Sequence, residues 1–248
     1  MSHRLVIIGL AAGFCSAFLG IGGGVIMVPS LFLLSGYDIK KAIGTSLSAI
    51  IPAAFVGAAT HYVINSSNIF FLAAVFLAAG SVAGSWAGSF IVRRLHSRIL
   101  TVSFSIFLAA TGLKQLGLFH IPATVDSNIL QWPFLLLLGS LAGTCSAMFG
   151  VGGGVLLVPF LSIFFGLNMH QAIATSLIVI VPTSIAGVFF HSKFNNVEIS
   201  ALRYIVPSSF FGAVSGAVLS NRFSSPDLQL IFGAFLIIIS ISLFFKKQ

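Results

Sequence analysis

The chain contains one unit of sequence twice. The stretches GFCSAFLGIGGGVIMVP and GTCSAMFGVGGGVLLVP recur at equivalent places in its two halves. Residues 13–61 align with 143–191 without a gap and are identical at 22 of 49 positions, so we interpret the chain as a tandem duplication. The pattern predicts a first repeat over residues 1–119, an inter-repeat linker over 120–129 and a second repeat over 130–248.

Each repeat consists of long apolar runs separated by short polar or basic linkers. Hydrophobic residues make up 58% of the 248 residues and charged residues only 6%, whereas a soluble domain has about 25% charged residues. A membrane β-barrel would show short alternating segments, which are not seen here. We therefore predict an all-α polytopic membrane protein with the lipid bilayer as its surroundings. The predicted segments are 4–35, 43–62, 69–93 and 99–119, then 130–165, 173–191, 200–221 and 228–245.

The first segment of each repeat is longer than one crossing needs. Residues 4–35 would span about 48 Å as a helix, against a hydrocarbon core of about 30 Å. If this segment crosses the membrane once, the 12 Lys and Arg residues divide evenly between the two sides. If it turns back, ten of them lie on one side of the membrane and two on the other. The positive-inside rule expects the second distribution. We therefore predict two inverted-topology repeats, each a re-entrant helical hairpin plus three transmembrane helices, with both termini cytoplasmic.

The net charge of +8 would suggest nucleic acid as the partner of a soluble protein. Here the basic residues lie at segment ends, where they orient the chain in the bilayer, so we expect no nucleic acid partner. A homodimer is left open.

Glycine triplets mark the predicted turn of each hairpin. Three glycines interrupt a helix, and non-helical backbone at membrane depth is tolerated only where protein or a water-filled cavity surrounds it. A short helix is predicted to begin at about Val25, with its N-terminus directed at the turn, and such an end binds anions. Close helix packing is the alternative use of the triplets, and the preferred one for Gly84, Gly88, Gly212 and Gly216. The substrate-binding candidates here are Gly22, Gly23, Gly24, Gly152, Gly153 and Gly154.

Hydroxyl side chains accompany the glycines in both repeats. Thr45 and Ser46, like their counterparts Thr175 and Ser176, lie at the predicted start of a span, where a hydroxyl caps the helix or donates to an oxyanion. Ser16 and Ser146 lie one turn before the predicted tips, and we expect them to face the same cavity.

The acidic residues exclude one common type of site. All four fall in linkers or at segment ends, so no carboxylate is expected at the bilayer centre, where one would indicate a cation or proton relay. Glycine N–H groups and hydroxyls favour a small anionic substrate instead. His61 and His191 are the titratable candidates; interfacial anchoring and proton coupling are the two roles considered. We expect no catalytic residues, no metal site and no cofactor.

The twin glycine-rich stretches, each followed by a TSL motif and a proline, resemble the TauE/SafE sulfite exporter family. The resemblance covers nearly the whole chain. It implies an inner-membrane transporter of sulfite, sulfoacetate or related organosulfonates, usually moved outward. Carried over by position, it implies that the triplets bind the substrate together with Thr45, Ser46, Thr175 and Ser176.

Four functions are compatible with an apolar helical chain of this size. The preferred one is export by alternating access. A passive anion channel is the alternative because no coupling carboxylate is present, and import of another small organic or inorganic anion is also retained. A membrane enzyme or receptor subunit is disfavoured, since the sequence offers neither a catalytic cluster nor a long linker.

Overall fold

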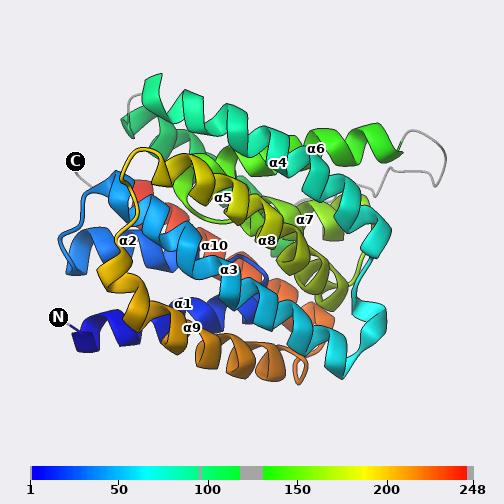
Figure 1. Ribbon diagram of the computed structural model, residues 1–248. Helices are drawn as coiled ribbons and strands as arrows, with labels where there is room; N and C mark the ends of the chain where they lie inside the picture. Colours follow the sequence, from blue (N-terminus) through cyan, green and yellow to red (C-terminus); the bar gives the residue numbers. More distant parts are fainter. Residues whose placement is uncertain (1, 95–96, 118–130, 245–248) are drawn as a thin grey trace.

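The computed structural model describes residues 2–94, 97–117 and 131–244, which form helices and contain no strand (Figure 1). The predicted all-α class is confirmed. The predicted linker, 120–129, lies outside the described residues. The helices are α1 (Ser2–Leu19), α2 (Gly24–Leu34), α3 (Ile39–Ile64), the short η1 (Ser66–Asn68), α4 (Phe71–Arg94), α5 (Ser97–Gln115), α6 (Gln131–Phe149), α7 (Gly154–Phe164), α8 (Met169–Ser192), α9 (Ile199–Ser220) and α10 (Ser225–Phe244).

The outer surface of the bundle is apolar. Large side chains such as Ile7, Phe71 and Phe211 are more than half exposed, which suits lipid and not water. Seven described helices are long and apolar enough to cross a membrane: α1, α3, α4, α6, α8, α9 and α10. The chain is therefore a multi-pass membrane protein.

The first predicted segment of each repeat is broken into two helices that turn back on each other. The Arg4 guanidinium at the start of α1 donates to the Leu34 carbonyl at the end of α2, with N···O 3.3 Å. In the second repeat the ring centroids of Phe134 and Phe164 lie 6.1 Å apart and join the start of α6 to the end of α7. Because α1 and α6 are long enough to span by themselves, it is the return of α2 and α7 that defines the hairpins.

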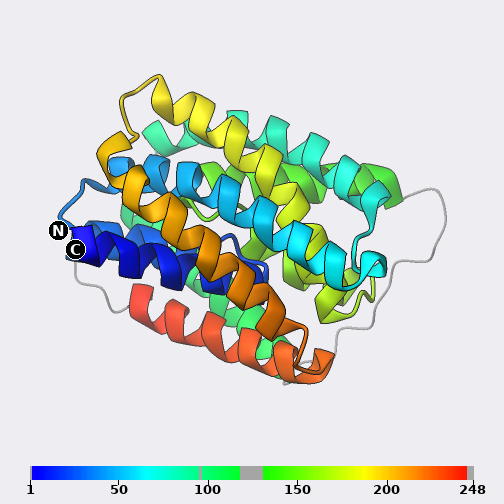
Figure 2. The same cartoon turned by 60° about the horizontal axis from the view of Figure 1, so that its bottom comes forward.

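The two repeats interlock. The closest helix pairs are α4 with α6, α1 with α9, α3 with α8 and α5 with α10, and each pair takes one helix from each repeat (Figures 1 and 2). The duplication relates the α1–α9 pair to the α6–α4 pair. In Figure 1 the first hairpin opens at the end of the bundle marked N, whereas α6 begins at the opposite end. The start of α1 and the end of α10 lie at the same end (Figure 2).

Glycines let the paired helices approach each other closely. A Cβ added at Gly84 of α4 would lie 1.9 Å from the Ser140 carbonyl oxygen of α6, and one at Gly212 of α9 would lie 2.3 Å from that of Leu10 in α1. No side chain fits at such distances. The packing role predicted for these glycines is confirmed.

We expect Gly84→Leu or Gly212→Leu to lower the thermal unfolding temperature of the purified protein. The added side chain must separate two helix backbones, and overpacking of this kind costs about 1–3 kcal/mol or more. Thermal unfolding in detergent measures the effect. Val82→Leu is the control, because Val82 is exposed on the same helix and has room for a larger side chain. An unchanged unfolding temperature for Gly84→Leu would contradict the packing.

Candidate functional site

The two hairpin tips meet inside the bundle. A Cβ added at Gly24 would lie 2.1 Å from the Gly150 carbonyl oxygen, and one at Gly154 would lie 2.2 Å from that of Gly20. Each tip therefore lies directly against the other. The structure thus brings both predicted glycine clusters to one place and gives them a packing role there.

The tip backbone has a conformation that favours glycine. Gly20, Gly22 and Gly23 have φ between 71° and 76°, and their counterparts in the second repeat have φ between 69° and 84°. L-residues with side chains rarely adopt this left-handed region. The chain therefore reverses at the tips, and α2 begins at Gly24, one residue before the predicted Val25. In the first turn of α2 the Ile26 and Met27 N–H groups bond the Gly23 carbonyl, and in α7 those of Leu156 and Leu157 bond the Gly153 carbonyl. The N–H groups of the two residues that begin each helix come before these bonds, beside the tips.

Each tip is hydrogen-bonded to one serine of the other repeat. The Ser46 hydroxyl on α3 donates to the Gly150 carbonyl at 2.9 Å, and the Ser176 hydroxyl on α8 donates to the Gly20 carbonyl at 2.9 Å. Both side chains are fully buried. The Ser46 proton therefore holds the second tip, whereas the single Ser176 proton has a second acceptor, the Ile173 carbonyl of its own helix at 2.8 Å.

The neighbouring threonines hold the starts of two other helices. The Thr45 hydroxyl oxygen accepts from the Glu198 N–H at 2.9 Å, just before α9, and that of Thr175 accepts from the Phe70 N–H at 3.1 Å, just before α4. Each threonine thus joins its own repeat to the other.

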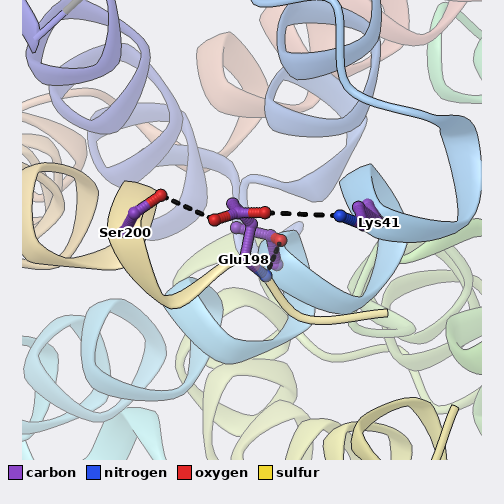
Figure 3. Close-up of polar contacts among 4 residues, drawn as sticks. Lys41, Glu198 and Ser200 are labelled. Atoms are coloured by element: carbon purple, nitrogen blue, oxygen red, sulfur yellow. Dashed lines mark hydrogen bonds and ion pairs between the residues drawn. The ribbon is translucent and has the colours of Figure 1, made fainter. Parts of the chain in front are cut away.

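An exposed ion pair lies next to the Thr45 contact, because Glu198 takes part in both. Figure 3 shows Glu198 between Lys41 and Ser200. The Glu198 carboxylate is 3.5 Å from Lys41 Nζ and accepts a hydrogen bond from the Ser200 hydroxyl at 2.6 Å. The Ser200 hydrogen bond lowers the pKa of Glu198 below its ordinary value, and the charge of Lys41 acts in the same direction. The pair is solvent-exposed, so it contributes little to stability.

The two histidines are buried and attached to the hairpins. His61 Nε2 is 2.9 Å from the Ala17 carbonyl oxygen, and His191 Nε2 is 3.1 Å from that of Ala147. In His61 the other ring nitrogen, Nδ1, faces the amide of Asn221 at 2.9 Å, so Nε2 carries the proton that Ala17 accepts. Interfacial anchoring is therefore wrong for this pair, because the rings are buried against α1 and α6. Proton coupling stays a prediction.

Ser16 and Ser146 lie beside the tips, and the Ser146 carbonyl accepts from the Gly150 N–H at 2.8 Å; that they face a shared cavity stays a prediction. Ser16 Cβ is 3.3 Å from the place where a Cβ of Gly23 would be. Both hydroxyls are fully buried, and neither has a hydrogen-bond partner within the described part of the chain. They are donors without an acceptor in this conformation.

Two grooves lie on the outer surface, away from the tips. One, of about 610 Å³, runs along α9 beside Phe14, and the other, of about 400 Å³, lies between α3, α4 and α8. Both are lined mainly by apolar side chains, and neither includes a tip residue. Within the described residues no group of three His, Cys, Asp or Glu side chains is placed to hold a metal ion. The site's polar groups are hydroxyls, backbone amides and two histidines.

Comparison with known proteins identifies the family. The model of the family described as "Sulfite exporter TauE/SafE" matches residues 1–115 and 135–248. The chain belongs to the TauE/SafE family. It is 28% identical to the probable membrane transporter protein YunE of Bacillus subtilis, over 98% of this chain and 97% of that protein. It is 31% identical to a probable membrane transporter protein of Methanocaldococcus jannaschii, over 77% and 72%. A sulfite exporter TauE/SafE family protein of Arabidopsis thaliana is 30% identical over 42% of this chain and 21% of its own.

Sequence reasoning missed one partner in this TauE/SafE protein. Asn221 follows α9 and bonds His61, yet it lies 160 residues away along the chain and has no counterpart among the motif residues.

We expect Ser46→Ala or Ser176→Ala to destabilise the protein. Each change leaves a buried glycine carbonyl without its donor, which costs about 1–3 kcal/mol. Thermal unfolding of the purified variants measures this. Ser48→Ala is the matched control on α3, because its hydroxyl bonds only the Gly44 carbonyl of the same helix at 2.9 Å. Equal unfolding temperatures for Ser46→Ala and Ser48→Ala would show that the tip bond contributes nothing.

Proposed function

We propose that this protein is a secondary transporter that exports small sulfur-containing anions, such as sulfite or organosulfonates, across the inner membrane by alternating access. The observation that carries the proposal is the meeting of two hairpin tips inside the bundle, each followed by the N-terminus of a helix. Neutral N–H and O–H donors suit an oxyanion, and the family supports a transporter.

The contact between the tips supports a gated cycle. Because Gly24 and Gly154 leave no room between the tips, an anion reaches the N–H groups only when one hairpin moves away from the other. Each tip is held by a different serine, Ser46 or Ser176, so one tip is free to open while the other stays closed. Alternating access requires two gates that open separately. A passive channel would need both open together.

The positions of the charges support an inverted topology with cytoplasmic termini. Arg4, Lys41, Lys193 and Arg203 lie at the end of the bundle where α1 begins, close to the Glu198 contact. Lys114 lies at the other end, with its ammonium 6.0 Å from the ring centroid of Phe164. In our proposal the end rich in basic residues faces the cytoplasm.

We expect a cysteine at position 40 to be reached only from the cytoplasm and one at position 66 only from the periplasm. Both Lys40 and Ser66 are exposed, and they lie at opposite ends of α3. Lys40→Cys and Ser66→Cys, each in a Cys15→Ser, Cys145→Ser background, are treated with a membrane-impermeant maleimide in intact and in opened cells. Labelling of Lys40→Cys in intact cells would overturn the topology.

Transport itself is tested in proteoliposomes loaded with sulfite, with and without a pH gradient. Flux against a sulfite gradient supports a coupled transporter, whereas flux that only equalises the two sides supports the channel. We expect Gly153→Ala to reduce flux at least tenfold, because the tip must keep a left-handed backbone at this position.

Gly166→Ala is the control for this variant. Gly166 also has positive φ, at 62°, and a Cβ there meets nothing within 4 Å, so the substitution introduces similar backbone strain at the far end of α7. Flux through Gly166→Ala should stay near that of the unmodified protein. If the two variants lose flux equally, the tip has no special part in transport.

A further inference from the structure

Buried hydroxyls gather where α4, α6 and α8 meet, beside the second hairpin. Ser81 Oγ of α4 is 2.5 Å from Thr183 Oγ1 of α8. Ser85 Oγ, one turn further along α4, lies 3.3 Å from the Gly143 carbonyl and 3.4 Å from that of Thr183. All three side chains are fully buried. The three helices thus share a polar strip inside an apolar bundle.

Beside the first hairpin, where α1, α3 and α9 meet, Ser209 is the one hydroxyl among the counterparts of these three residues. Thr183, Ser184 and Ser85 correspond to alanines in the other copy, and these belong to a small apolar cluster or lie next to it. The equivalent helices pack in the same way, α1 with α9 and α3 with α9, as α6 and α8 pack with α4. The fold therefore does not require the hydroxyls of Thr183, Ser184 and Ser85, because alanine fills the equivalent positions beside the first hairpin. The alanine counterparts are Ala53, Ala54 and Ala213, respectively.

Two members of the region have unused donors. Ser184 Oγ and Ser146 Oγ are fully buried without a hydrogen-bond partner among the residues described. Ser184 Oγ lies 3.6 Å from the place where a Cβ of Gly152 would be, so it faces the second tip. A buried hydroxyl without a partner is costly. Ser16, the counterpart of Ser146, also has a buried hydroxyl without a partner among the described residues. Ser184 distinguishes the two tips, because its counterpart is Ala54.

We propose that the transported anion binds off centre, at the second tip, through the hydroxyls of Ser184 and Ser146. This inference rests on the proposed function and assigns the site to one repeat. When the tip moves away from α8, the two hydroxyls and the first N–H groups of α7 face the same space, and they donate to the oxygens of a small oxyanion. Thr183 and Ser81 bond each other beside it and orient the strip.

The test measures binding of sulfite to the purified protein by titration calorimetry, with thiosulfate, sulfoacetate and acetate for comparison. Ser184→Ala and Ser146→Ala should each weaken sulfite binding about tenfold, as expected for the loss of a hydrogen bond to a charged ligand. Ser16→Ala, the counterpart of Ser146→Ala, should change the Kd less than threefold. Ala54→Ser, which places a hydroxyl opposite Ser184 in the other repeat, should leave it unchanged.

Thermal unfolding separates binding from folding. Ser184→Ala removes a hydroxyl that has no partner and creates the residue found at the equivalent position, so its unfolding temperature should equal or exceed that of the unmodified protein. Tight binding by Ser184→Ala, or equal losses for Ser16→Ala and Ser146→Ala, would overturn the off-centre site while leaving the proposed function intact. Failure of the unmodified protein to bind any of the four anions would overturn the proposed function, and the site with it.

Discussion

The fold depends on satisfying the backbone where the two hairpins turn inside the bundle. A membrane offers no water to a free carbonyl, so each one at that depth needs a donor from the protein. Gly20 and Gly150 receive theirs from Ser176 and Ser46, which belong to the opposite repeat. Neither repeat therefore completes its own tip. This explains why the main helix contacts join the repeats and are not made within one of them.

The same constraint accounts for the glycines. Reversing the chain over four residues requires left-handed backbone, and bringing the two reversals into contact leaves no room for a Cβ at Gly24 or Gly154. Glycine is therefore needed at Gly22 and Gly23 for their backbone conformation, and at Gly24 because no side chain fits there. In the proposed transport cycle both properties are needed, because a side chain would cover the N–H groups and would also keep the tips apart.

Much of this architecture was predictable from the sequence. The low share of charged residues predicted the all-α membrane class, and the glycine triplet located the start of α2 within one residue. The partners of Ser46 and Thr45 were not predictable, because they lie 104 and 153 residues away in the other repeat. The position of these hydroxyls in the motif suggested that they cap a helix, whereas in the structure they bond backbone groups of the other repeat. His61 was misplaced for the same reason: a position near the end of a span does not reveal that another helix covers it.

The duplication also provides an internal control for assigning roles. A feature present in both repeats, such as the histidine bonds to Ala17 and Ala147, is explained by the fold that both repeats share. A feature present in one repeat only cannot be explained in this way. The hydroxyl at Ser184 is one such feature, since Ala54 fills the equivalent position. Because the bundle tolerates alanine there, the unpartnered hydroxyl is retained at a cost to stability, and a ligand that accepts its proton accounts for that cost.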